Sequence, residues 1–183
     1  MILHKKVHRA KPIATMFAAI ALTFGTGASA EESADLRYTV AVISDAAQGR
    51  LILKERYETA IEKLEPLNPY GLRGFNTANN LCVAYIKVGD KTNAKQACQL
   101  AVERIQHVID FTPAAKHGRN PDQDYGRLLA IALSNLGVTY VINADHELAR
   151  AAFTAAIDTE ADAREPFINL ARLDQQIESE GSV

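Results

Sequence analysis

The chain has 183 residues, of which 48% are hydrophobic and 23% charged, and its net charge is −2 at pH 7. This length allows one or two small cores, and 10 Gly and 6 Pro are too few for a disordered or linker-rich chain. Two cysteines exclude a disulfide-dense scaffold, the charge argues against a general nucleic-acid binder, and no apolar run reaches the roughly 18 residues of a membrane-spanning helix. These features predict a soluble globular protein.

The first thirty residues have the three parts of a secretory signal peptide. Residues 1–12 contain four basic residues and no acid, residues 13–24 are apolar, and small residues follow up to Ala30. We expect cleavage after Ala30 and a single mature domain, residues 31–183, that is periplasmic or secreted. Cleavage removes four of the 20 basic residues and none of the 22 acids, so the mature net charge becomes −6.

Two later segments of the chain resemble each other. Residues 80–102 and 135–157 share Asn, Leu, Val, Tyr, Asp and two Ala at a constant offset of 55 residues. A third copy begins at Asn169, which is 34 residues after Asn135, and residues 57–61 form a partial fourth. The repeat therefore has a 34-residue period, interrupted by two insertions.

This pattern resembles the tetratricopeptide repeat (TPR) family, whose unit is a helix–turn–helix of 34 residues. The resemblance rests on residues in four units: Tyr57 and Ala60; Leu81, Tyr85, Gly89, Asp90, Ala94 and Ala101; Leu136, Gly137, Tyr140, Asp145, Ala149, Phe153 and Ala156; Phe167, Leu170 and Ala171. It implies an all-α fold, a right-handed α-solenoid of antiparallel helix pairs with about three and a half repeats. The units span about 33–64, 75–108 and 125–158, with a terminal helix at 163–178.

Within these units the pattern predicts helices at roughly 33–47, 50–64, 76–88, 91–108, 125–142, 146–158 and 163–178. Val40, Val42 and Ile43 give the first of these some strand character. Asp90 and Asp145 follow the turns and are expected to cap the second helix of each pair.

Cys82 and Cys98 lie symmetrically about the turn at residue 90, which places them opposite each other in a helical hairpin. An exported chain with a single cysteine pair usually oxidises it, so we predict a disulfide. Two small buried thiols are the alternative.

No catalytic or metal-binding pattern is present, so we expect neither an enzyme nor a cofactor. His107 and His117 are spaced unlike metal ligands, and the chain has no nucleophile elbow and no phosphate-binding loop.

The resemblance instead implies a concave groove formed by the first helix of each unit. By position in the unit, its candidate residues are Asn76, Asn79, Val83, Ile86, Lys87, Ile131, Ser134, Val138, Val141, Ile142, Ile168 and Arg172. Some family members bind a C-terminal carboxylate there with basic residues and Asn. Asn80 and Asn135 are present here, but Ser134 and Val138 replace the basic residues, so an apolar or amphipathic partner is expected.

The sequence thus favours an exported protein–protein interaction adaptor that binds a peptide or helix of another protein, with no nucleic acid and no membrane span. One alternative is a small hydrolase or ligand-binding protein with a site in the loop at 109–124. Another is a structural subunit of an envelope complex. The aliphatic stripe of the groove could also pack against the insertions or the N-terminal helix.

Overall fold

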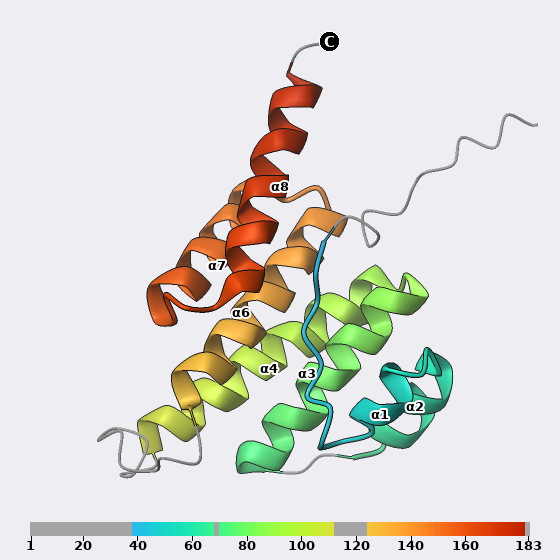
Figure 1. Cartoon of the computed structure of the whole chain (residues 1–183). Helices are drawn as coiled ribbons and strands as arrows, with labels where there is room; N and C mark the ends of the chain where they lie inside the picture. The colour runs from blue at the N-terminus through green and yellow to red at the C-terminus, as the bar shows by residue number, and fades with distance from the viewer. Residues whose placement is uncertain (1–37, 68–69, 112–123, 182–183) are drawn as a thin grey trace, which may run out of the picture. The chain divides into compact units, whose positions relative to one another are not determined.

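The computed structural model of the chain describes residues 38–67, 70–111 and 124–181, all of which belong to one compact unit (Figure 1). The predicted signal peptide lies outside the described residues. The helices account for all the regular secondary structure of the described residues, which contain no β-strand. The helices are α1 (Gly49–Ile52), α2 (Tyr57–Leu64), α3 (Gly71–Val88), α4 (Lys91–Phe111), α6 (Tyr125–Ile142), α7 (His146–Thr159) and α8 (Arg164–Glu180).

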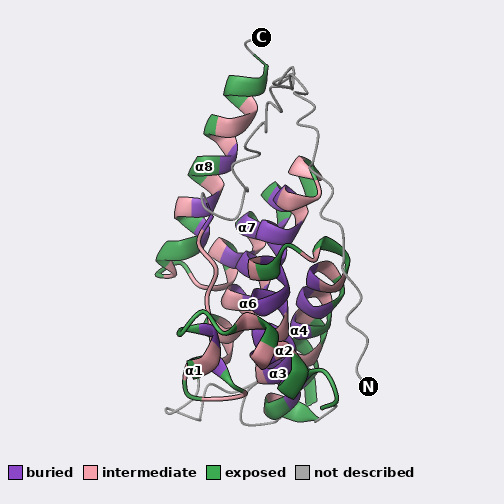
Figure 2. Cartoon of the chain, turned by 90° about the vertical axis from the view of Figure 1, so that its right-hand side faces the viewer, coloured by how far each residue is buried: buried purple, intermediate pink, exposed green. Residues whose placement is uncertain are grey.

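Two helical hairpins form the centre of the fold. Helix α3 packs along α4 and α6 packs along α7, while α4 also contacts α6 and α8 packs on α7 and α6 (Figure 1). Small residues at the contacts, among them Ala94, Ala101, Ala149 and Ala156, are fully or almost fully buried and let the helices approach closely. Figure 2 shows the buried residues on the facing sides of these helices.

Both hairpin turns have the hydrogen bonds of a helix that ends in a left-handed residue. Asp90 N–H donates to the Tyr85 carbonyl after Gly89 (φ 78°), and Asp145 N–H donates to the Tyr140 carbonyl after Ala144 (φ 59°). Asp90 caps α4 as predicted, because its Oδ1 accepts from Asn93 N–H at 3.1 Å. The predicted Asp145 cap is wrong: its carboxylate makes no capping bond.

Asp145 instead pairs with Lys95 of the neighbouring hairpin, with Nζ 3.5 Å from Oδ2. The carboxylate therefore links α4 to the turn before α7, which leaves the first N–H groups of α7 without a side-chain cap.

The main difference from the predicted elements lies at the N-terminus. The helix predicted at 33–47 is wrong for its described part, because residues 39–43 have no helical structure and 44–48 form turns. The helix predicted at 50–64 is broken at 53–56 into α1 and α2, with Glu55 in a left-handed conformation (φ 57°).

Helix α6 differs from one expectation about membranes. It is 18 residues long with a mean hydropathy of 1.3, which by length and composition alone would suit a membrane span. The expectation that no apolar stretch reaches that length therefore needs correction. Half of this window is buried, and α6 packs against α4, α7 and α8, so its apolar composition is that of a core helix.

A candidate binding groove filled by the chain itself

Three asparagines occupy the same repeat position on three helices. Asn80 on α3, Asn135 on α6 and Asn169 on α8 are all fully buried. A buried primary amide is stable only when its hydrogen-bonding groups are paired, so each needs a partner inside the protein. We call these three residues the asparagine ladder.

The partner of the ladder is the backbone of the chain's own N-terminal segment, defined here as residues 38–43. Each asparagine Oδ1 accepts from one backbone N–H and each Nδ2 donates to the carbonyl of the same residue. The donor–acceptor distances are 2.8 and 2.8 Å for Asn169 with Thr39, 2.8 and 2.9 Å for Asn135 with Ala41, and 2.9 and 3.0 Å for Asn80 with Ile43. Each helix therefore binds one residue of the extended segment, and the three bound residues alternate along the same edge of the segment.

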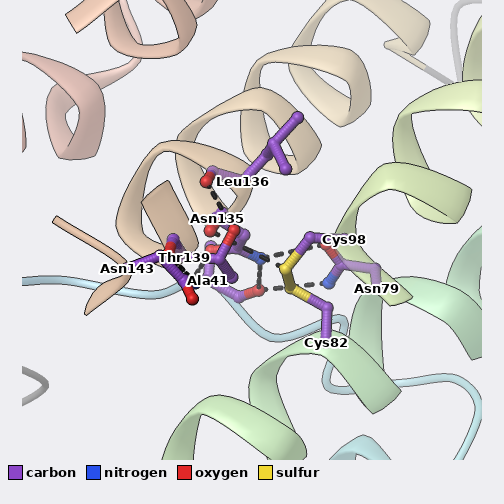
Figure 3. The surroundings of a disulfide bond; sticks show 8 residues. All are labelled: Ala41, Asn79, Cys82, Cys98, Asn135, Leu136, Thr139 and Asn143. Carbon is purple, nitrogen blue, oxygen red and sulfur yellow. Dashed lines mark hydrogen bonds between the residues drawn. A yellow bond between two sulfur atoms is a disulfide. The ribbon is translucent and has the colours of Figure 1, made fainter. Parts of the chain in front are cut away.

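A second row of polar side chains supports the ladder. Asn79 donates from Nδ2 to the Ala41 carbonyl at 3.1 Å, and its Oδ1 accepts from Asn135 Nδ2 at 3.0 Å. Ser134, the equivalent residue in the next unit, lies with its Oγ 3.3 Å from Asn169 Nδ2. Figure 3 shows Ala41 between Asn79 and Asn135. These contacts help to orient the Asn135 and Asn169 amides of the ladder.

Side chains fix the register of the N-terminal segment. The Tyr38 ring stacks on Phe153 at 6.3 Å between centroids, and its hydroxyl donates to Gln176 Oε1 at 2.8 Å. Val40 and Val42 pack on the buried cluster that contains Leu64 and Val83, and Ile43 packs on the cluster around Phe75. A shift by one residue would remove Tyr38 from its contacts and turn the ladder-bonded groups away from the asparagines.

The predicted groove residues fall into three groups around this segment. The aliphatic residues Val83, Ile86, Val138 and Val141 are buried, with exposed fractions of 0–4%. Val40 of the N-terminal segment packs on the clusters that contain them, so the stripe is covered by the chain's own N-terminal part, which is the alternative left open above except that this part is not a helix. Asn79 and Ser134 belong to the polar row, and Arg172 lies with its guanidinium 3.4 Å from Thr39 Oγ1. The remaining candidates, Asn76, Lys87, Ile131, Ile142 and Ile168, are half-buried.

The ladder residues can be recognised in the sequence, but their role cannot. The recurrence of Asn at one repeat position was the available signal, yet Asn80 and Asn135 were compared only with a carboxylate clamp. Their actual partners lie 37 and 94 residues away along the chain, and that of Asn169 lies 130 away. No local pattern links residues so far apart.

The predicted disulfide is present directly beside the ladder. Cys82 on α3 and Cys98 on α4 are bonded with their Cα atoms 4.8 Å apart, and both residues are fully buried. Cys98 Sγ lies 3.8 Å from the Asn135 carbonyl oxygen (Figure 3). The disulfide therefore joins the first hairpin at the level where α6 presents its ladder residue.

One titratable group near the disulfide has a shifted pKa. Burial raises the pKa of Tyr85 above its usual range, and a hydrogen bond from its hydroxyl to Glu65 Oε1 at 2.7 Å adds to the shift. The phenol stays neutral and ties the end of α2 to α3, which is a structural role.

The described residues do not assemble an alternative chemical site. The loop proposed at 109–124 lies outside them except for residues 109–111 and 124, and they contain no group of three or more His, Cys, Asp or Glu placed to hold a metal. A pocket of about 540 Å³ lies over the outer face of α4 and is lined by Tyr70, Leu100, Arg104, His107 and Phe111 among others.

Comparison with known proteins identifies no relative: no protein family, no curated protein and no solved structure matches the chain.

Proposed function

We propose that this chain is an exported, TPR-like interaction adaptor whose groove binds an extended polypeptide segment through its main chain. In this interpretation the signal peptide is removed after Ala30, and the mature protein is periplasmic or secreted. The helix pairs α3–α4 and α6–α7, followed by α8, are successive units of a right-handed solenoid.

The asparagine ladder is the observation that carries the proposal. Three fully buried amides, one on each of α3, α6 and α8, bind an extended segment. Each amide bonds to both the N–H and the carbonyl of one residue, and the bound residues are every second residue of the segment. Main-chain hydrogen bonds of this kind give affinity with little dependence on sequence, while the flanking side-chain pockets add selectivity. The N-terminal segment is thus the groove's built-in ligand, and a partner segment would take its place.

The aromatic and aliphatic pockets describe the chemistry of a suitable partner. Tyr38, Val40, Val42 and Ile43 occupy them, so an extended segment with an aromatic residue followed by β-branched residues fits best. The absence of basic residues at Ser134 and Val138 argues against an acidic tail. An amphipathic helix would not reach alternate ladder positions, because its backbone groups are already bonded to one another.

A cut in the turn after the N-terminal segment tests the proposal. A protease recognition sequence is inserted at the exposed Asp45, the protein is cleaved, and it is refolded with an excess of a fluorescent peptide of residues 38–44. We expect the peptide to bind with a clear rise in fluorescence anisotropy, since it carries the ladder contacts of Thr39, Ala41 and Ile43.

Backbone methylation supplies a matched control. A methyl group on the Ala41 nitrogen removes a hydrogen bond to Asn135, whereas one on the Val40 nitrogen removes none within the described residues. We expect at least about tenfold weaker binding for the first peptide, in line with roughly 1.4 kcal/mol or more for one buried hydrogen bond. Failure of the unmodified peptide to bind, or equal binding of both methylated peptides, would contradict main-chain recognition.

A further inference from the structure

The turn between the N-terminal segment and α1 has an unfavourable backbone. Ala47 (φ 44°) and Gln48 (φ 61°) are consecutive residues in the left-handed region, which residues with a Cβ rarely adopt. Neither is Gly, Asn or Asp, the residues that tolerate this conformation best. The turn is held in this shape by the contacts on both sides of it.

Close packing explains why the turn is wound so tightly. Gly49 follows the two left-handed residues, and a Cβ atom on it would lie 2.1 Å from the Ile43 carbonyl oxygen. Asn80 Nδ2 lies 3.0 Å from both the Ala46 and the Ala47 carbonyl oxygens. The chain therefore turns back directly at the end of the N-terminal segment, and the last ladder residue fastens the turn.

The groove is complementary to the side chains at both ends of this segment. Tyr38 contacts Phe153 and Gln176 at one end, and Ile43 packs on the cluster around Phe75 at the other. A second copy of the chain carries the same segment. Short hinges under strain favour exchange of such a segment between copies, since opening the hinge relieves the strain while the contacts of the segment itself are kept.

We propose that two copies of this chain exchange their N-terminal segments, so that residues 38–43 of each lie in the groove of the other. This inference rests on the proposed function and names a second copy as the partner of that groove. The ladder bonds to Thr39, Ala41 and Ile43 are the same in both forms. Opening of the turn removes the backbone strain at Ala47 and Gln48. It also breaks the hydrogen bonds from Asn80 to the Ala46 and Ala47 carbonyl oxygens.

Complementation between two defective full-length chains tests the exchange. Ala41→Pro lacks the N–H that Asn135 binds, so its segment is defective and its groove intact; Asn135→Ala has the opposite defect. Only a mixed pair can form one intact segment–groove contact. With the disulfide kept oxidised, the two chains are given different affinity tags and refolded together at high protein concentration. We expect at least about tenfold more mixed dimer than either variant forms with itself.

The wild-type protein and a hinge variant provide a second test, which does not depend on whether the two defective chains fold. After refolding at high concentration, light scattering should detect a dimer of the wild type, and Ala47→Gly/Gln48→Gly should contain less of it because Gly removes the strain. A wild type that stays monomeric, or a mixture with no excess of mixed dimer, would overturn the exchange. In that case, peptide binding to the cleaved chain would still support the proposed function, so the two failures are distinguishable.

Discussion

The α3–α4 and α6–α7 hairpins are built on equivalent residues 55 positions apart, yet they close the same contact between their helices differently. In the first hairpin Cys82 and Cys98 form a disulfide. In the second, the equivalent residues are Gly137 and Phe153, and a Cβ atom on Gly137 would lie 2.4 Å from the Phe153 ring. The two hairpins therefore fill the space between their helices in different ways. The first uses a covalent bond between two small residues, and the second packs a large aromatic ring against a glycine that has no side chain.

The difference also reaches the N-terminal segment. The Phe153 ring covers Gly137 on one side and stacks on Tyr38, so the second hairpin contributes directly to the groove. The disulfide instead contacts the backbone carbonyl of Asn135, and the Asn135 side chain binds the N-terminal segment. The contact between the helices of the first hairpin is therefore covalent, whereas the corresponding contact of the second hairpin also touches the N-terminal segment.

Loss of the disulfide should have the largest effect of the changes that test this comparison. Closing a loop of about 15 residues stabilises a protein by roughly 3 kcal/mol, mainly by restricting the unfolded chain. We expect Cys82→Ala/Cys98→Ala to lower the free energy of unfolding by about 3 kcal/mol in urea titrations. Reduced wild type should behave in the same way, and an unchanged urea midpoint would contradict the estimate.

Transplanting the second solution into the first hairpin sharpens the same test. In Cys82→Gly/Cys98→Phe the ring should cover the glycine as Phe153 covers Gly137. Burying a Phe side chain contributes about 1.5–3 kcal/mol, and Gly in a helix costs about 0.5–1 kcal/mol relative to Ala, so this variant should recover about 0.5–2.5 kcal/mol of the loss seen for the double Ala variant. If it is less stable than the double Ala variant, the two contacts are not interchangeable.

Gly137→Ala should have the next largest effect. Phe153 is fully buried and cannot move away from an added methyl group, so overpacking should cost about 1–3 kcal/mol of unfolding free energy. Gly126→Ala on the same helix is the matched control, because its Cβ would meet nothing closer than 3.4 Å. That change should be neutral or stabilising by up to about 1 kcal/mol, since Ala favours a helix over Gly. Equal effects of both changes in urea titrations would refute the role of the Phe153 contact.

The helices of both hairpins could be predicted because their signals are local. Small residues at fixed spacing and a turn residue determine where each helix begins and ends, and α6 runs from 125 to 142 as predicted. The outer ends of the first hairpin, where the chain enters α3 and leaves α4, are predicted less accurately. Helix α4 continues to Phe111 beyond the predicted 108, and α3 begins at Gly71 rather than 76.

The N-terminal segment could not be predicted in the same way. Its alternating Val40 and Val42 carry an extended pattern, but six residues with such a pattern are too few to exclude a helix. What decides the conformation is the ladder on three other helices, which satisfies the backbone groups that a helix would have bonded internally. The disulfide was predictable because its two residues share one hairpin.

The hairpin turns provide the smallest and last test of the comparison. Gly89 and Ala144 are equivalent residues in the left-handed region, with φ values of 78° and 59°. An L side chain costs about 1–2 kcal/mol there, partly offset by the greater flexibility of Gly in the unfolded chain. We therefore expect Ala144→Gly to stabilise the protein and Gly89→Ala to destabilise it, each by about 1 kcal/mol in thermal or urea unfolding. The open space around Gly89 means that a methyl group there would touch nothing within 4 Å, so the loss would report backbone strain alone. Both turns share the hydrogen bond from the Asp N–H to the Tyr carbonyl, so shifts of the same sign for both variants would show that the left-handed residue does not decide the difference between them.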